Sequence, residues 1–187
     1  MRPFLPGSSR ILLLGSFPPP VNRWSMDFYY PNFQNDMWRI MGLIFYNNPL
    51  YFIKEKAFDK ERITTFCKEK GIALYDTAMR IVRGSGNASD KFLEVLQPID
   101  IENVLTRLPG CKTVAVTGQK AGETLLEVIR ENGYAGKLSL PAMGNYVTFL
   151  FRERTVKLYR MPSTSRAYPM SLEKKASYYR TIIPTLL

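Results

Sequence analysis

Apolar and polar positions divide this sequence into short apolar runs and longer amphipathic segments. The apolar runs with the length and composition of strands are residues 10–15, 72–76, 113–117, 147–151 and 156–159. Elsewhere apolar residues recur at helical spacing, which predicts helices over residues 36–45, 59–70, 101–108, 120–132 and 171–183. This alternation predicts a three-layer α/β fold with a mostly parallel sheet. We find neither a repeat nor a linker and expect one domain over residues 1–187.

Two loops of unusual composition follow strands. Three consecutive prolines, Pro18, Pro19 and Pro20, forbid a helix after the first strand and predict a long loop up to Asn35. A second loop covers residues 161–170, after the last strand. Because sites in α/β folds usually lie at the carboxyl ends of the strands, we expect the chemistry of this protein in these two loops.

The first loop is rich in flat rings and side-chain amides and has almost no charge. Its rings are those of Phe28, Tyr29, Tyr30 and Phe33, and its amides are those of Asn32, Gln34 and Asn35. Such a mixture suits a planar heterocycle, for example a flipped or single-stranded base, which stacks on a ring and is hydrogen-bonded along its edge. An aromatic plug that packs on the sheet is the structural alternative.

The second loop combines small hydroxyl residues with basic ones. Ser163, Thr164 and Ser165 lie between prolines, and Arg160 and Arg166 flank them. Because hydroxyl, backbone N–H and guanidinium groups all bind phosphate, the segment predicts a contact with a nucleic-acid backbone. An ordinary Pro/Ser turn before the last helix is the alternative.

Composition narrows the chemistry. The chain has 187 residues, 45% of them hydrophobic and 13% aromatic, which is enough for a core of ordinary size. It has no histidine, which excludes Ser-His-Asp triads, Cys-His proteases and histidine general bases. With 26 Lys and Arg against 16 Asp and Glu, the net charge is +10, and this favours a nucleic-acid partner slightly over a merely basic enzyme.

Cysteine content and hydropathy bear on the compartment. Cys67 and Cys111 are too few for an iron–sulfur cluster, and we expect neither a metal nor an organic cofactor. Two cysteines allow one disulfide or two free thiols, and we expect free thiols in a cytoplasmic protein. No apolar run forms a signal peptide or reaches the roughly 20 residues of a membrane span, so we expect a soluble protein with no membrane partner.

The two loops carry motifs that resemble a known family. A strand ending in Gly15-Ser16-Phe17-Pro18, followed by Tyr29-Tyr30 and then by Asn35 and Trp38, is similar to the first motif of the uracil-DNA glycosylase superfamily. It looks most like the branches that act on mismatched uracil or thymine and on hypoxanthine. Pro162-Ser163-Thr164-Ser165 resembles the second motif, in the expected order and at about the expected spacing. The resemblance covers nearly the whole chain.

The resemblance implies a role for each matching residue of the first loop. Gly15 and Ser16 match the tight loop that activates water. Tyr30 matches the aromatic residue that stacks on the extruded base, and Phe17 is assigned to base binding beside it. Asn35 matches the amide implicated in catalysis in the hypoxanthine branch.

For the second loop, the resemblance implies contacts with DNA. Pro162, Ser163, Thr164 and Ser165 match the loop that pinches the DNA backbone and wedges into the duplex. Arg166 stands where the hypoxanthine branch tends to have proline, and we expect it to enter the minor groove or bind phosphate. The family fold implied is a three-layer α/β/α sandwich with a four-stranded central sheet, and the implied state is a monomer.

The chemistry of N-glycosidic cleavage is compatible with a chain that has no histidine. The reaction needs stabilisation of two separating charges more than a strong nucleophile, and an amide such as Asn35 orients water or donates to the departing base. Asp27, Asp36 and Asp76 are the candidate carboxylates for polarising water, although Asp36 is first of all a residue at a helix N-terminus.

Two departures from the family pattern bear on the substrate. Many superfamily members have Asp or Asn after the first-motif glycine and His at the head of the second motif. Here these places hold Ser16 and Met161. We therefore expect an amide-centred reaction, such as removal of hypoxanthine, more than efficient excision of uracil.

We therefore expect a DNA glycosylase of base excision repair. It would hydrolyse the bond between deoxyribose and a deaminated base, hypoxanthine or uracil, in single- or double-stranded DNA and leave an abasic site. The rival hypothesis is a nucleic-acid-binding protein that keeps this fold and pocket without turnover. A third is an enzyme that acts on free nucleosides or nucleotides.

Three further segments carry weaker signals. Residues 118–124 lack the Gly-Lys-Ser/Thr ending of a phosphate-binding loop. Arg80, Arg83 and Lys91 flank a glycine-rich stretch at residues 83–89, which a solvated surface loop explains as well as a DNA contact does. The run Glu173-Lys174-Lys175 predicts an exposed helix face.

Overall fold

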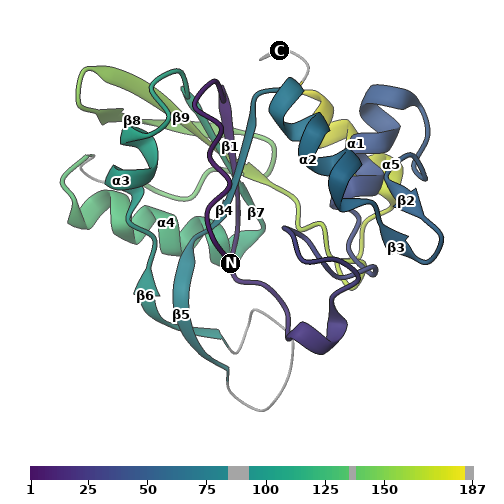
Figure 1. Cartoon of the computed structure of the whole chain (residues 1–187). Coiled ribbons are helices and arrows are strands. Elements are labelled where there is room, and N and C mark those ends of the chain that lie inside the picture. Colours follow the sequence, from purple (N-terminus) through teal and green to yellow (C-terminus); the bar gives the residue numbers. More distant parts are fainter. Residues whose placement is uncertain (84–92, 135–137, 184–187) are drawn as a thin grey trace.

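A mixed α/β fold is built around a central sheet (Figure 1) in a computed structural model that describes residues 1–83, 93–134 and 138–183. The strands of this sheet lie in the order β4-β1-β7-β9-β8. Their bounds are Ile11–Gly15 (β1), Ile72–Asp76 (β4), Thr113–Thr117 (β7), Tyr146–Phe151 (β8) and Arg154–Met161 (β9). Strands β4, β1, β7 and β9 are parallel, whereas β8 is antiparallel to β9. The mostly parallel sheet predicted from the sequence is therefore confirmed.

Among the described residues this sheet has five strands, so the expected count of four is wrong. The additional strand is β8, at the edge of the sheet. β8 and β9 are joined by Arg152 and Glu153 alone, and Arg152 adopts a φ of 53° in the turn. A parallel neighbour would need a crossover connection of about a dozen residues, so a link this short permits only an antiparallel hairpin.

Helices cover both faces of the sheet (Figure 1). Helices α1 (Met37–Tyr46), α2 (Lys60–Glu69) and α5 (Leu172–Arg180) pack on one face, and α3 (Ile101–Thr106) and α4 (Gln119–Glu131) pack on the other. Alternate residues of β1 enter the two cores, because successive side chains of a strand point to opposite faces. Thus Ile11 and Leu13 pack with the first group of helices, and Leu12 and Leu14 with the second.

The two cysteines lie in different cores, on opposite faces of the sheet. Both thiols are buried and free, as expected from the sequence. Burial raises the pKa of Cys111 to about 11 and raises that of Cys67 further. Both groups are therefore neutral thiols at physiological pH and act as core residues.

The N-termini of α2, α3 and α5 follow from capping residues in the sequence. The carboxylates of Asp59 and Asp100 accept from backbone N–H groups in the first turns of α2 and α3, and the hydroxyl of Ser171 does the same for α5. Helix α5 ends at Arg180, three residues short of the predicted end, with Ile182 and Ile183 buried beyond it.

Two short hairpins were not predicted. They are β2–β3 (Ile53–Lys54 and Ala57–Phe58) and β5–β6 (Ala78–Arg83 and Leu93–Pro98), and both pair antiparallel. The strands β2 and β3 have two residues each and are too short to show an alternating pattern. The predicted turn-rich loop at residues 83–89 begins at the end of β5 and otherwise lies outside the described residues. Among the helices of the described residues, none has the length and apolar character needed to span a membrane.

Candidate functional site

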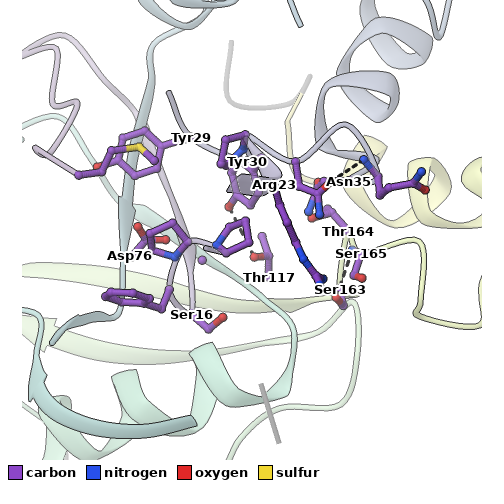
Figure 2. A pocket seen from close by; sticks show the side chains of 18 of the residues that line it. Ser16, Arg23, Tyr29, Tyr30, Asn35, Asp76, Thr117, Ser163, Thr164 and Ser165 are labelled. Carbon is purple, nitrogen blue, oxygen red and sulfur yellow. Dashed lines mark hydrogen bonds between the residues drawn. The ribbon is translucent and has the colours of Figure 1, made fainter. Parts of the chain in front are cut away.

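A cavity of about 320 Å³ lies where β1, β4 and β7 end, and both predicted loops line it (Figure 2). Every residue assigned from the sequence lines it except Pro162 and Arg166; those present are Gly15, Ser16, Phe17, Tyr30, Asn35, Ser163, Thr164 and Ser165. Parallel strands bring Asp76 and Thr117 to the same cavity from the ends of β4 and β7. The two loops thus meet at one cavity at the carboxyl edge of the sheet.

Gly15 and Asp76 face each other as register partners at the ends of β1 and β4. A Cβ atom on Gly15 would lie 2.7 Å from Oδ1 of Asp76, which is too close for two non-bonded heavy atoms. The backbone beyond them is fixed, since Thr77 donates to the carbonyl of Gly15 and Ala78 to that of Ser16. Glycine is therefore required at position 15 for the Asp76 carboxylate to occupy its place.

Tyr30 lies in the middle of the cavity lining in Figure 2 and adopts an uncommon backbone conformation, with a φ of 52°. Its hydroxyl lies 3.5 Å from Oγ1 of Thr117, which in turn donates to the carbonyl of Leu14. Since Thr117 uses its proton on Leu14, the Tyr30 hydroxyl is the donor in the first contact. Burial raises the pKa of Tyr30 far above its usual range, so the hydroxyl stays protonated.

The ring of Tyr30 is packed edge-to-face against Trp38 of α1, with 6.1 Å between the ring centroids. Trp38 is itself buried and donates its indole N–H to the carbonyl of Tyr29. The aromatic part of the first loop is thus anchored in the core while part of it still lines the cavity. Packing of this aromatic segment on the core, the structural alternative drawn from the sequence, therefore does not remove it from the cavity lining.

Asn35 has its side-chain oxygen fixed by the start of α1. Oδ1 accepts from the backbone N–H of Met37 at 2.9 Å, and because that donor needs an acceptor, the amino group of Asn35 points elsewhere. Arg39 holds the same segment by donating to the carbonyls of Phe33 and Asn35. Burial and the nearby charge of Arg166 lower the pKa of Arg39. In Figure 2, Asn35 lies beside Thr164 and Ser165, away from Ser16 and Asp76.

In the second loop, internal hydrogen bonds fix Ser163 and Ser165. The hydroxyl of Ser163 accepts from the N–H of Ser165, and the hydroxyl of Ser165 accepts from that of Ala167. Pro162 is buried and its carbonyl accepts from the hydroxyl of Tyr179 on α5. The loop is therefore a braced turn before α5, as the structural alternative predicted, and it carries hydroxyl groups to the cavity.

Two predictions about charged residues need correction or restriction. Lys175 is completely buried and bonded to Asp36, so the predicted exposed face of residues 173–175 is wrong at this position. The Lys175 side chain points to the buried face of α5. A charged side chain is tolerated there because Asp36 pairs with it. Arg166 is half exposed but bonded to Asp36 as well, at 3.0 Å, so its guanidinium is partly engaged within the protein.

The structure separates the three candidate carboxylates. Asp27 is 81% exposed and 3.8 Å from Lys60, and Asp36 is bonded to Lys175 and Arg166. Among them, only Asp76 lines the cavity, where it is 8% exposed. Its signal in the sequence was its place as the last residue of a buried strand, which holds equally for Thr117 at the end of β7.

Met161 does not face this cavity. It is completely buried and packs in the core shared by α1, α2 and α5. The cavity lining also takes in Asn32, named from the sequence only as one of the loop amides, and Arg23, which was not named from the sequence. Within the described part of the chain, no group of three or more Cys, Asp or Glu side chains is arranged to hold a metal ion.

Comparison with known proteins shows a related fold. No family model and no curated protein matches the sequence. A solved structure does match: the solution NMR structure of a "putative Uracil DNA glycosylase" from Methanosarcina acetivorans. The TM-score is 0.68 at 21% sequence identity, and the match covers 99% of this chain and 97% of that one. The chain thus shares the fold of that protein over essentially its whole length.

Proposed function

We propose that this protein is a monofunctional, monomeric DNA glycosylase of one domain that hydrolyses the N-glycosidic bond of a deaminated base and leaves an abasic site. The observation that carries the proposal is the meeting of Tyr30, Asn35 and Asp76 in one cavity. A ring, an amide and a carboxylate are groups that stack on a base, bond to its edge and polarise water. The fold shared with a protein described as a uracil DNA glycosylase supports the same class.

The proposed reaction needs one water and no cofactor. The water oxygen bonds to C1′ of deoxyribose while the C1′–N bond breaks and its electron pair leaves with the base. The base departs as an anion and takes up a proton, and the proton lost by the water passes through Asp76. The amino group of Asn35 donates to a carbonyl oxygen of the base, where negative charge develops. Hydrogen bonds that strengthen as this charge forms lower the barrier.

Hypoxanthine is the base that this site is proposed to favour, with uracil as the second substrate. Both bases carry a carbonyl oxygen where the undamaged parent base has an amino group. The donor that Asn35 retains is matched to such an oxygen, whereas an amino group in its place would put two donors against each other. The hydroxyl of Tyr30 stays protonated, so this residue adds no negative charge that would oppose a departing anion.

DNA is proposed to bind across the second loop and the mouth of the cavity. Ser163 and Ser165 supply hydroxyl and backbone N–H groups, and Arg166 supplies charge beside them. These are the usual partners of phosphate oxygens, and the net charge of +10 strengthens the attraction of the whole protein to DNA. The target base would be extruded from the helix into the cavity.

The proposal is tested by incubating the protein with duplexes that carry hypoxanthine, uracil, xanthine or a G·T mismatch and then cleaving abasic sites with alkali. We expect strand scission with the hypoxanthine duplex and loss of it in Asn35→Ala. Asn103→Ala is the matched control, because Asn103 is exposed on α3, on the other face of the sheet. Scission by every variant alike would point to a contaminant.

A binding protein without turnover would behave differently in the same experiment. It would bind the damaged duplexes with strong salt dependence and release no base from any of them. An enzyme of free nucleosides would bind a nucleoside more tightly than an oligonucleotide. Either result would refute the glycosylase proposal.

A further inference from the structure

A completely buried lysine, Lys175, lies under the junction of the two cavity loops. Its ammonium group donates to Oδ2 of Asp36 at 2.9 Å and to the carbonyl of Ser165 at 2.8 Å. The side chain of Asp36 is 8% exposed and that of Lys175 is 1% exposed. A single group of α5 therefore contacts the start of α1 and the second loop together.

Asp36 contacts the second loop at two points and helix α5 at a third. Oδ2 faces Lys175, Oδ1 accepts from Nε of Arg166 at 3.0 Å, and its backbone N–H donates to the carbonyl of Thr164 at 2.8 Å. Neighbouring backbone contacts run alongside, from Arg166 to the carbonyl of Gln34 and between Asn35 and Ser165. One carboxylate thus lies between two cations, directly after Asn35 in the chain.

Stability alone does not account for this arrangement. The free energy lost when an ammonium and a carboxylate are removed from water is commonly larger than the free energy gained from their attraction. Apolar side chains of similar volume often stabilise a core equally well. What a buried pair with three hydrogen bonds does provide is a single geometry. Here the fixed contacts connect Asp36, which follows Asn35 in the chain, to the second loop, which is proposed to bind the DNA backbone.

We propose that Lys175 and Asp36 are positioning residues that fix the Ser163–Ser165 turn and Arg166 relative to Asn35. The proposal rests on the proposed function and deepens it. Arg166 is held through Nε, and its two terminal nitrogens meet no acceptor among the described residues. They remain available to a phosphate oxygen at a fixed distance from the amide. Binding of the DNA backbone and placement of the base in the cavity are thereby coupled.

The test compares Lys175→Met with Lys174→Met, a substitution of the exposed neighbour on the same helix. Two quantities are measured on folded protein, well below the unfolding temperature: the single-turnover excision rate and the salt dependence of binding to a duplex with an abasic site. We expect Lys175→Met to lower the rate about 10- to 100-fold and to flatten the salt dependence, because the loop and Arg166 shift relative to Asn35. Lys174→Met should change neither.

A double variant separates positioning from stability. Asp36→Asn with Lys175→Met leaves no unpaired buried charge and should recover much of the unfolding temperature that Lys175→Met loses. If the pair positions the loops, excision and salt dependence stay impaired in this double variant. Recovery of both functions together with stability would overturn the proposal. If Lys175→Met alone does not fold, the double variant is compared directly with the wild type.

Coupling to Arg166 supplies an independent check. Arg166→Ala should weaken DNA binding in the wild-type background and have a clearly smaller effect in the double variant, because residues that act through one contact are not additive. Additive effects would contradict the proposal. Should the wild type excise no base at all, the glycosylase assignment fails, whereas the binding measurements on the abasic duplex still decide the role of Lys175.

Discussion

The two loops that line the cavity are held in place by different physical means. The first loop is anchored by aromatic packing and by hydrogen bonds to backbone carbonyls, as in the contacts of Trp38 and Arg39. The second loop is held by a buried charge, through Lys175 and Asp36. Rings and amides of the first loop therefore line the place proposed for the base, beside the carboxylate of Asp76, whereas Lys175, Asp36 and Arg166 concentrate charge at the place proposed for the DNA backbone.

This difference suggests a division of labour. Arg39, the charged residue that anchors the first loop, is not part of the cavity lining, so the rings and amides of this loop leave the cavity suited to a neutral heterocycle. A charged anchor keeps Arg166 oriented at the surface, where a phosphate would be met. Substitutions in the first loop should then act on the chemical step, and substitutions in the second should act on affinity and its dependence on salt.

The largest effect is expected at Asn35. Removal of one donor to a developing anion costs about 10²- to 10³-fold in rate, and we expect this loss in Asn35→Ala. Asn35→Asp is the informative partner, because it keeps the acceptor for the N–H of Met37 and replaces the amino donor with a carboxylate oxygen. Single-turnover rates of excision measure both.

Equal losses in the two Asn35 variants would identify the amino group as the active part. Unfolding temperatures should separate them, since Asn35→Ala also loses the contact with Met37, worth about 1 kcal/mol at a helix start. An excision rate of Asn35→Asp at or above that of the wild type would contradict the role of Asn35 as a donor to the base. It would indicate that position 35 acts on water.

The next effect is expected from Gly15→Ala. The added methyl would lie 2.7 Å from Oδ1 of Asp76 and displace the carboxylate from the cavity, with a loss of roughly 10- to 100-fold in rate. Gly7→Ala is the matched control, because a Cβ there meets no atom within 4 Å. Circular dichroism should be unchanged in both. An active Gly15→Ala would show that Asp76 is not needed where it lies.

Much of the fold was predictable because local signals and tertiary structure agree. Strands β1, β4 and β7 are apolar runs bounded by turn residues, and their ends in the structure match the predicted ones within a residue. The helices begin at capping residues that the sequence displays, such as Asp59 and Ser171. Hairpin β2–β3 was missed because its two-residue strands carry no periodic signal.

The membership of the site was predictable only where the signal was local. Tyr30 and Asn35 stand out in an aromatic, amide-rich loop. Asp76 was one of three candidate carboxylates with Asp27 and Asp36 and was not singled out, because the pairing of β4 with β1 that brings it to Gly15 is a long-range contact. Lys175 was misassigned for the same reason: its partner Asp36 is 139 residues away in the chain. Contacts between residues far apart in the chain cannot be predicted from the local pattern of a single sequence.

A smaller effect, confined to binding, is expected from Arg166→Ala. Loss of one phosphate contact should lower the slope of log K against log salt by about 1, while the rate from bound substrate stays near that of the wild type. Arg152→Ala serves as the control, because Arg152 is exposed and paired with Glu102 on the other side of the molecule. An unchanged slope would place the phosphate contact elsewhere on the protein.

The smallest effect is expected from Tyr30→Phe, which separates the ring from the hydroxyl. The hydroxyl makes one long contact, 3.5 Å from Thr117, so its loss should lower the excision rate less than about fivefold. Burial keeps the pKa of Tyr30 above its usual range, so no ionisation of this group should appear in the pH–rate profile below about pH 10, and wild type and Tyr30→Phe should have profiles of the same shape. Tyr30→Ala, which removes the ring, should cost more than Tyr30→Phe because stacking is lost. A new pH dependence in Tyr30→Phe, or a loss equal to that of Tyr30→Ala, would mean that the hydroxyl takes part in the chemistry and that the first loop is not limited to neutral stacking.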